Sequence, residues 1–206
     1  MDSDALLAAR IQAALPQTQC TRCGYPDCAS YARAIAQGQA SINQCPPGGA
    51  EGVVRLAAIT GQPVRPLNPA HGTEGPRTVA VIDEDWCIGC TLCAKACPTD
   101  AITGIHKRMH TIIEEHCTGC ELCVPACPVD CIAMENVSGD ATGWAAWSAP
   151  LQQHARQRYE SHQARLALSI PEAVTPALPD APQADPRKST IAAVLARARE
   201  RSTQRL

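Results

Sequence analysis

The chain has 206 residues and contains no phenylalanine, three tryptophans and three tyrosines, so aromatic rings can supply little of a hydrophobic core. Much of its apolar content is alanine and cysteine, which favours small modules held together by metal clusters rather than by packing alone. The net charge of −2 divides into +1 for residues 1–77, −6 for residues 78–137 and +3 for residues 138–206. An acidic middle suits basic partner surfaces, although it also serves simply to keep that part in solution.

The beginning of the chain predicts a small helical domain. Apolar side chains recur every four residues over 3–15, which predicts a helix that a proline ends. Further helices are expected over 27–37 and 50–60, each followed by a glycine. We therefore expect a domain over 1–62, followed by a linker over 63–77, where four prolines and two glycines fall within fifteen residues.

Four cysteines in this first domain have the spacing of a metal site. They follow the pattern Cys20-x2-Cys23-x4-Cys28-x16-Cys45. Four thiolates within 26 residues can bind either an iron–sulfur cluster or a zinc ion. The spacing alone leaves both alternatives open.

Residues 78–137 contain an internal repeat with an offset of 30. Between 86–102 and 116–132, ten of seventeen positions are identical, which predicts two halves related by a pseudo-twofold axis. A helical turn is expected in each half, over 92–96 and 122–126. Four short strands are expected to flank the cysteine runs, over 78–82, 101–105, 109–113 and 131–135.

Each half of the repeat carries three cysteines in seven residues and then a Cys-Pro pair, which is typical of a ferredoxin with two [4Fe–4S] clusters. Zinc sites usually combine two separated CxxC units, so zinc fits this pattern poorly. In such ferredoxins the fourth cysteine binds the other cluster. The predicted sets are therefore Cys87, Cys90, Cys93 and Cys127 for one cluster, and Cys117, Cys120, Cys123 and Cys97 for the other. Gly89 and Gly119 lie within the loops, where a positive φ or a close approach of the backbone is expected.

The remaining cysteine, Cys131, is interpreted as a small buried residue beside a cluster rather than as a replacement ligand. Thirteen cysteines are an odd number, and no signal peptide follows Met1, so a disulfide framework is not expected. No nucleotide, flavin or nucleophile motif occurs, and we expect no catalytic residues and no complete enzyme in this chain alone. No run reaches the roughly 18–20 apolar residues of a membrane-spanning helix.

The last third of the chain predicts helices separated by a proline-rich linker. We expect a helical extension over 138–170 with one helix from Pro150 to about residue 168, then a linker over 171–188. A basic amphipathic helix is expected over 189–206. The fold class is therefore α+β, with a four-cysteine helical domain, a ferredoxin-type domain over 78–137 and a helical or disordered tail.

The quoted motifs resemble the B subunit of the Rnf/Rsx electron-transport complex over roughly residues 1–137. The similarity is carried by the run Leu-Pro-Gln-Thr-Gln-Cys20-Thr-Arg-Cys23-Gly-Tyr-Pro-Asp-Cys28, by Asn-Gln-Cys45-Pro-Pro-Gly-Gly, and by the ferredoxin repeat. The resemblance implies a third [4Fe–4S] cluster on the first four cysteines. It also implies electron transfer between ferredoxin and nicotinamide pools, coupled to ion movement in a membrane complex. The hydrophobic first helix of that family is missing here, which favours a soluble relative.

We expect an electron-transfer protein that relays single electrons through three [4Fe–4S] clusters between protein redox donors and acceptors. The alternative is the electron-input subunit of a membrane-bound, ion-translocating ferredoxin/NAD oxidoreductase. The expected location is the cytoplasm, or the inner membrane surface where partners hold the protein there. A zinc or nucleic-acid-binding module is disfavoured, because the acidic middle opposes phosphate.

Overall fold

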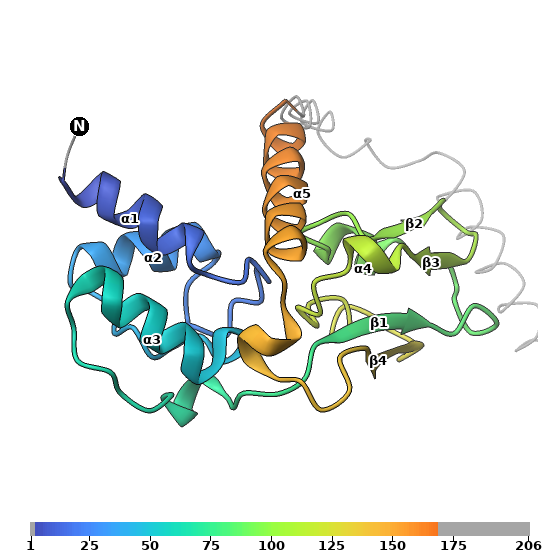
Figure 1. The fold of residues 1–206 in the computed structure, drawn as a ribbon. Helices are drawn as coiled ribbons and strands as arrows, with labels where there is room; N and C mark the ends of the chain where they lie inside the picture. Colours follow the sequence, from blue (N-terminus) through green and yellow to red (C-terminus); the bar gives the residue numbers. More distant parts are fainter. Residues whose placement is uncertain (1–2, 169–206) are drawn as a thin grey trace, which may run out of the picture. The chain divides into compact units, whose positions relative to one another are not determined.

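The computed structural model describes residues 3–168, which begin with three helices. These are α1 (Ser3–Ala13), α2 (Cys28–Ala36) and α3 (Gly49–Thr60) (Figure 1). The Asp27 side chain caps α2 by accepting a hydrogen bond from the backbone of Ser30 at 2.5 Å, and Gly61 ends α3 in the left-handed conformation. All three predicted helices are confirmed to within two residues at each end.

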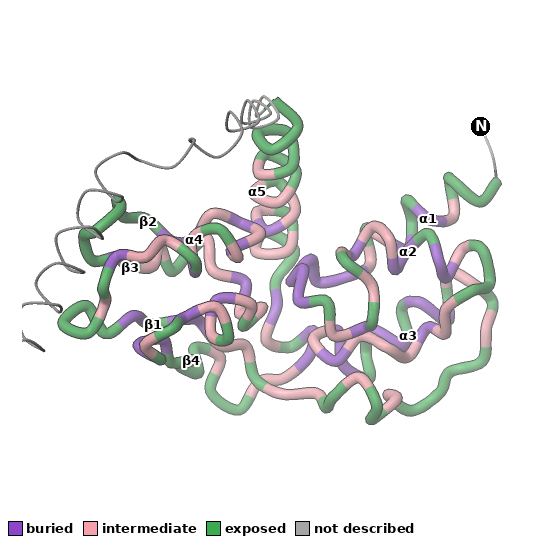
Figure 2. Tube along the Cα trace, turned by 180° about the vertical axis from the view of Figure 1, so that it is seen from behind, coloured by how far each residue is buried: buried purple, intermediate pink, exposed green. Residues whose placement is uncertain are grey.

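The three helices enclose a core of their own, seen as the purple inner side of α1–α3 in Figure 2. Its fully buried side chains include Ile11, Tyr31, Ile42 and Leu56. The Tyr31 hydroxyl donates a hydrogen bond to the carbonyl of Ser41 at 2.7 Å, so this large ring is buried with its polar group satisfied.

Short 3-10 turns lie between the longer elements. η1 (Pro46–Gly48) lies between α2 and α3, η2 (Pro69–His71) follows α3, and η3 (Glu114–His116) lies in the second half of the repeat.

The segment 63–77 lies along this helical part and is attached to it. The backbone N–H of Asn68 donates to the carbonyl of Asn43 at 2.9 Å, and His71 Nδ1 lies 3.1 Å from the carbonyl of Arg22. The proline-rich composition indicates a linker, but the hydrogen bonds make this segment a strap with a fixed course.

Two small antiparallel sheets follow. β1 (Thr78–Ile82) pairs with β4 (Ile132–Asn136), with Ala80 opposite Met134, and β2 (Ile102–Gly104) pairs with β3 (His110–Ile112). These strands confirm the four predicted ones to within two residues at each end. The protein is therefore a mixed fold of helices and small sheets, as predicted.

The two cysteine runs differ in their local backbone. α4 (Leu92–Ala96) is the predicted helical turn of the first run, closed by a bond from the N–H of Lys95 to the carbonyl of Thr91 at 3.1 Å. Residues 122–126 of the second run form consecutive turns instead of a helix. Pro125 stands at the position equivalent to Lys95 and has no N–H to donate, which explains the difference.

The core between the two sheets is rich in sulfur. Few large apolar side chains take part, and none of them is aromatic. Its buried residues are Ala80, Ile82, Cys93, Cys97, Ala101, Ile102, Cys123, Cys127, Cys131 and Ile132. Half of this list is cysteine, so the packing of the sheet part depends on the state of its thiols.

After β4 the chain returns toward the helical part. Pro76 and Thr142 form an isolated antiparallel bridge, and η4 (Gly143–Ala146) then places Trp144 against α3. The Arg55 guanidinium lies 4.0 Å from the centroid of the Trp144 ring, a cation–π contact. Trp144, Trp147 and Ala155 form a third, small core.

The long helix α5 (Ala149–Leu168) lies between the helical part and the sheets (Figure 1). Gln152 Nε2 donates to the carbonyls of Ala13 and Leu15, at 2.8 and 3.0 Å. Further along, the Arg158 guanidinium donates to the carbonyl of Thr99 at 3.0 Å. Polar side chains of α5 thus bind both the helical part and the part that contains the sheets.

Within residues 3–168, no helix is both long enough and apolar enough to cross a membrane. The predicted linker over 171–188 and helix over 189–206 lie outside the described residues.

The contact between α5 and Asp100 predicts a pH-dependent stability. Burial would raise the pKa of Asp100, but hydrogen bonds and charge from Arg165 and His162 outweigh it and hold this pKa below its usual range. A lowered pKa stabilises the fold fully above the unfolded value of about 4, and this contribution is lost as the pH falls through the folded value. Asp100→Asn should therefore lower the stability at neutral pH by about 1 kcal/mol. The urea unfolding midpoint of both proteins, followed from pH 7 downward, measures the difference.

Asp130→Asn is the matched control, because Asp130 is the repeat counterpart of Asp100 and is exposed. It should leave the midpoint unchanged at every pH. The assigned role is that the ionised carboxylate of Asp100 stabilises the fold. A difference in urea midpoint between wild type and Asp100→Asn that stays constant down to pH 3 would contradict it.

The conformation of Gly119 predicts a second effect on stability. Its φ is +67°, and an added Cβ would lie 2.3 Å from the carbonyl oxygen of Thr78 in β1. Gly119→Ala should cost about 1 kcal/mol for the left-handed backbone and about 2 kcal/mol more for the displaced strand. Gly61→Ala is the control, because Gly61 has a φ of +72° and open space around it. Urea unfolding of both variants without oxygen measures the loss of stability in each, and the difference gives the cost of the clash with Thr78. Equal losses of stability would show that the close approach of residue 119 to Thr78 is unimportant.

Candidate metal centres

The first cysteine run of the repeat lines a small hollow. Five cysteines line it. Cys87, Cys90 and Cys93 come from this run, Cys127 is the last cysteine of the other run, and Cys131 lies four residues beyond Cys127. Apolar side chains such as Ile82 and Val129 complete the wall. Apart from Cys131, these cysteines form one of the sets assigned from the sequence.

The second run lines a similar small hollow. Its cysteines show the same exchange between the two runs, and they are Cys97, Cys117, Cys120 and Cys123. The remaining wall is again mostly apolar, with Ile102, Ile112 and Met134. The structure therefore brings together both predicted sets, each with one cysteine from the opposite half of the repeat.

Backbone N–H groups from the neighbouring strands point at the sulfur atoms. The N–H of Ala101 donates to Cys97 Sγ at 3.2 Å, that of His110 to Cys87 Sγ at 3.3 Å, and that of Ala80 to Cys117 Sγ at 3.4 Å. Hydrogen bonds of this kind stabilise negative charge on a thiolate or on a cluster bound to it. Edges of the small sheets thus supply the donors for both hollows.

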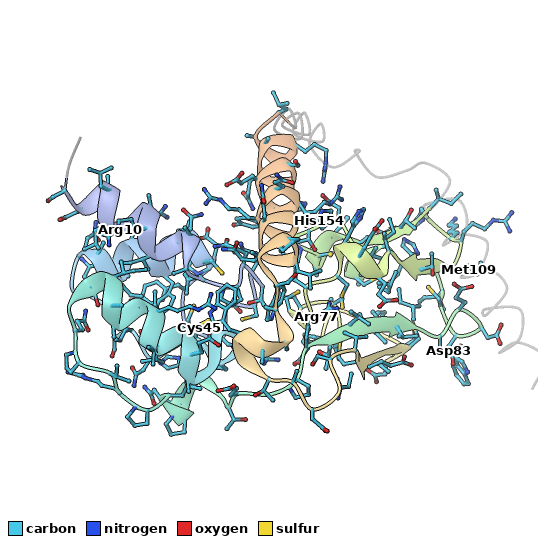
Figure 3. The ribbon with its side chains drawn as sticks, viewed as in Figure 1. Arg10, Cys45, Arg77, Asp83, Met109 and His154 are labelled. Carbon is cyan, nitrogen blue, oxygen red and sulfur yellow. The ribbon has the colours of Figure 1, made fainter. Side chains whose placement is uncertain are left out.

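The first four cysteines gather in the loops around α2 and α3. Cys20, Cys23 and Cys28 are buried, and Cys45 precedes η1 with its thiol enclosed (Figure 3). The hydroxyl of Thr18 donates to Cys20 Sγ at 3.4 Å. The sequence-predicted set is therefore close together in space, on loops that short helices hold in place.

Two buried glutamines hold the loop before Cys20. Gln19 accepts a hydrogen bond from the N–H of Cys28 at 2.9 Å and donates to Gln17 at 3.1 Å, and Gln17 in turn donates to the carbonyl of Gln12. Gln17 and Gln19 also have left-handed backbones, with φ of 63° and 54°. Sequence reasoning missed this chain of amides, although two glutamines beside a cysteine in an otherwise small core are an unusual feature.

Burial favours the neutral form of several thiols in these sets, because it raises their pKa. Burial raises the pKa of Cys28 and Cys45, and the neighbouring cysteines of the same set raise it further. In the sheet part, burial raises the pKa of Cys120 and Cys123 to about 12. Thiolates in such surroundings need a positive group close by, which is what bound iron supplies. The donor set is thus suited to clusters.

The pKa of Cys127 is shifted in the opposite direction. Burial would raise its pKa, but the backbone N–H groups of Cys131, Val129 and Asp130 outweigh this effect and lower it. Cys131 lies behind it, with the two sulfur atoms 3.5 Å apart, and burial followed by the nearness of Cys127 raises the pKa of Cys131 to about 12. Cys131 is buried beside the hollow, where the sequence interpretation places it.

All thirteen cysteines are free thiols, and none forms a disulfide. Within residues 3–168, no three or more Cys, His, Asp or Glu side chains lie close enough together to hold a single metal ion. A four-iron cube makes a different demand, because each thiolate binds a different iron atom and the sulfurs stand further apart.

A short chain of hydrogen bonds connects the first four cysteines to the second run. Thr118 follows Cys117, and its buried hydroxyl donates to the carbonyl of Thr18 at 2.9 Å. The Thr18 hydroxyl in turn donates to Cys20 Sγ. An ion pair between Arg22 and Glu121 at 2.6 Å lies beside this connection. Nothing in the spacing of the cysteines indicates which run would lie next to the helical part.

Comparisons with known families match both groups of cysteines. A family model described as a 4Fe-4S dicluster domain matches residues 80–134, and one described as a putative Fe-S cluster matches residues 15–47. Together the two matched ranges contain all the predicted ligands.

Similar curated proteins share one name, that of the B subunit of an ion-translocating oxidoreductase complex. The protein of Azoarcus sp. (strain BH72) is 60% identical over 145 residues, which are 70% of this chain and 79% of that protein. The protein of Thiobacillus denitrificans is 59% identical over 70% of this chain and 77% of its own length. That of Alkalilimnicola ehrlichii is 52% identical over 73% and 81%. With these identities and this coverage, the chain belongs to the Rnf/Rsx family of B subunits of ion-translocating oxidoreductase complexes.

Proposed function

We propose that this iron–sulfur electron-transfer protein is a relay with three [4Fe–4S] clusters, one in each group of four cysteines. The observation that carries the proposal is the exchange of cysteines between the two hollows of the sheet part. Three cysteines of a run and the fourth of the other run is the arrangement that a two-cluster ferredoxin needs. The ligands are Cys20, Cys23, Cys28 and Cys45; Cys87, Cys90, Cys93 and Cys127; and Cys97, Cys117, Cys120 and Cys123.

A pseudo-twofold relation between the halves of the sheet part belongs to this proposal. Backbone angles at equivalent positions support it: φ is 68° at Gly89 and 67° at Gly119, and 51° at Asp100 and 50° at Asp130. Left-handed conformations are uncommon outside glycine, so their recurrence at an offset of 30 is informative. The relation implies that both hollows offer a cluster the same surroundings near the ligands.

A cluster rather than a zinc ion is the proposed occupant of the first four cysteines. The match to a putative Fe-S cluster family over residues 15–47 supports iron. The spacing of the side chains does so too, because no three of them in the described part of the chain converge on one point. A structural zinc ion would draw its four ligands into a compact tetrahedron.

A bound [4Fe–4S] cluster supplies a centre that accepts and releases one electron at a time. The residues of this chain do the rest. Apolar walls exclude water from the hollows, and the N–H groups of Ala80, Ala101 and His110 favour additional negative charge on the sulfurs. These contacts raise the reduction potential relative to a site without donors.

The proposed order of the relay follows from the contact between Thr18 and Thr118. Because this contact connects Cys20 to Cys117, the first four cysteines are neighbours of the second run. The first run then lies at the other end, and it shares with the second run the sulfur-rich core. Electrons would enter or leave at the two ends of this series.

Membership of a larger complex is the second part of the proposal. Each of the similar proteins is named as a subunit of an ion-translocating oxidoreductase complex. We assign the same role to this chain, as the electron-input subunit held at the membrane by its partners. This role and that of a free electron carrier use the same chemistry and differ only in the partners.

Metal analysis tests the number of clusters. Protein purified without oxygen should contain about twelve iron and about twelve sulfide per chain, as three four-iron clusters require. Cys45→Ala should retain about eight of each, and Cys131→Ala, which removes a cysteine outside the three sets, should retain them all.

The exchanged ligands predict that Cys127→Ala alters the same electron paramagnetic resonance signal as Cys90→Ala, and Cys97→Ala the same signal as Cys120→Ala.

About eight iron together with one zinc per chain would make the first site structural and would leave a two-cluster ferredoxin. Protein without iron after anaerobic purification would overturn the electron-transfer function of this chain. Signals that pair Cys127 with Cys120 instead of Cys90 would contradict the exchange.

The glutamine chain predicts a selective loss of the first cluster. Gln19→Leu removes the acceptor of the Cys28 N–H in a buried site, which should cost about 1–3 kcal/mol. Iron should then leave the first four cysteines faster than in the wild type when a ferrous chelator is added, and the loss should stop at about eight iron per chain. Gln39→Leu, at an exposed glutamine, is the control. Equal rates of iron loss in the two variants would show that Gln19 has no such role.

A further inference from the structure

Large apolar side chains are exposed beside the first cysteine run. Trp86 directly precedes Cys87 and is 69% exposed, and Ile88 directly follows it and is 58% exposed. The other two tryptophans of the chain, Trp144 and Trp147, are buried, so the exposure of Trp86 is unusual. Apolar patches of this kind, with charged residues around them, mark interaction sites.

The repeat shows what covers the equivalent surface in the other half. Positions 86, 88 and 91 correspond to His116, Thr118 and Glu121. His116 stacks on His154 of α5, with 5.3 Å between the ring centroids. Thr118 and Glu121 bind Thr18 and Arg22 of the helical part. One half of the repeat thus uses this surface to hold another part of the same chain. In the first half, Trp86 and Ile88 at the corresponding positions are exposed, and no contact within residues 3–168 covers them.

An open groove of about 390 Å³ lies beside Trp86. Its wall includes Val129, Cys131 and Ile132, and these three residues also line the hollow of the first cysteine run. A protein seated in the groove would therefore be separated from that hollow by a single layer of side chains. Figure 3 shows Asp83, which lines this groove, at the outer side of the sheets, away from Cys45 in the helical part.

The charge around the groove has one sign. Asp83 and Asp130 line it, and Glu84 and Asp85 are exposed next to Trp86. The basic residues of the sheet part, Lys95, Lys107 and Arg108, lie on α4 and on the turn between β2 and β3, and none of them lines the groove. An acidic rim around an apolar centre is complementary to a surface with the opposite rim.

We infer that this groove is a docking site for a redox partner protein whose contact surface has an apolar centre and a rim of lysine and arginine. Trp86 is the anchor, and Asp83, Glu84, Asp85 and Asp130 select the basic rim. The inference rests on the proposed function, since a cluster in the adjacent hollow gives the partner a reason to bind here. The docking itself is a property of the surface and is testable without electron transfer.

Oxidised cytochrome c is a suitable probe, because it is a basic protein with lysines around an exposed haem edge. Titration calorimetry of the oxidised, cluster-containing protein with this probe should show binding that weakens steeply as salt is added. Trp86→Ala should weaken the binding by about tenfold or more, as expected for an aromatic anchor at an interface. An acidic flavodoxin should not bind.

Matched variants distinguish the contribution of the groove from the effect of net charge and from the loss of any exposed apolar side chain. The pair Glu84→Lys with Asp85→Lys should abolish the salt-sensitive binding, whereas Asp4→Lys with Asp140→Lys makes the same change in net charge at exposed sites elsewhere and should retain most of it. Val64→Ser removes an exposed apolar side chain from the strap and should have no effect. Carbodiimide cross-linking to the probe should join its lysines to the peptide that carries residues 83–85.

Iron analysis of each variant keeps the two proposals apart. If iron is absent but the probe still binds at residues 83–85, the relay fails and the docking site stands. If the iron is complete but the probe does not bind, or cross-links only elsewhere, the docking site is overturned and the relay stands. A self-association that Trp86→Ala dissolves, measured by sedimentation, would assign the groove to a second copy of this chain and overturn the proposed partner.

Discussion

Burying a thiolate removes its hydration, and this constraint governs the whole molecule. In the core between the two sheets, sulfur replaces most of the large apolar side chains of an ordinary domain, and in the helical part Cys23 and Cys28 are buried within an apolar core. Burial raises the pKa of several of these thiols, so their ionisation needs a positive partner close by. Ligation and folding are therefore coupled in this chain, because the group that neutralises the thiolates also completes the core.

The two halves of the repeat share left-handed backbone conformations at equivalent positions, such as Gly89 and Gly119, but have different surroundings. The loop of Cys117 is enclosed by the helical part and α5, with polar residues at the contact points. The loop of Cys87 carries tryptophan and isoleucine at the same positions and faces outward. One half of the repeat therefore faces the rest of the protein and the other half faces solvent. This difference suits a series of redox centres in which one end contacts the helical part and the other end contacts a partner.

Much of this fold could be predicted from local patterns. The strands, three helices and the glycines at positions 89 and 119 follow from hydrophobic periodicity and from the spacing of the cysteines. The contacts that join the parts could not be predicted in this way. Thr18 and Thr118 are a hundred residues apart, and Gln152 reaches Ala13 through one amide, so neither pair leaves a periodic signal. Residues 63–77 have the composition of a linker, because prolines give no information about the neighbours that hold them.

The chain crosses between the helical part and the sheets twice, outward along residues 63–77 and back along residues 138–148. Glu74 fastens the two crossings, since its carboxylate accepts hydrogen bonds from the N–H of Ala50 and from the hydroxyl of Thr142, both at 2.8 Å. Parts joined by one flexible segment usually move relative to each other. A double crossing pinned by a carboxylate resists such hinge motion. Electron tunnelling decays steeply with distance, so a stiff joint lets the rate between neighbouring centres be set by the folded geometry instead of by thermal fluctuation.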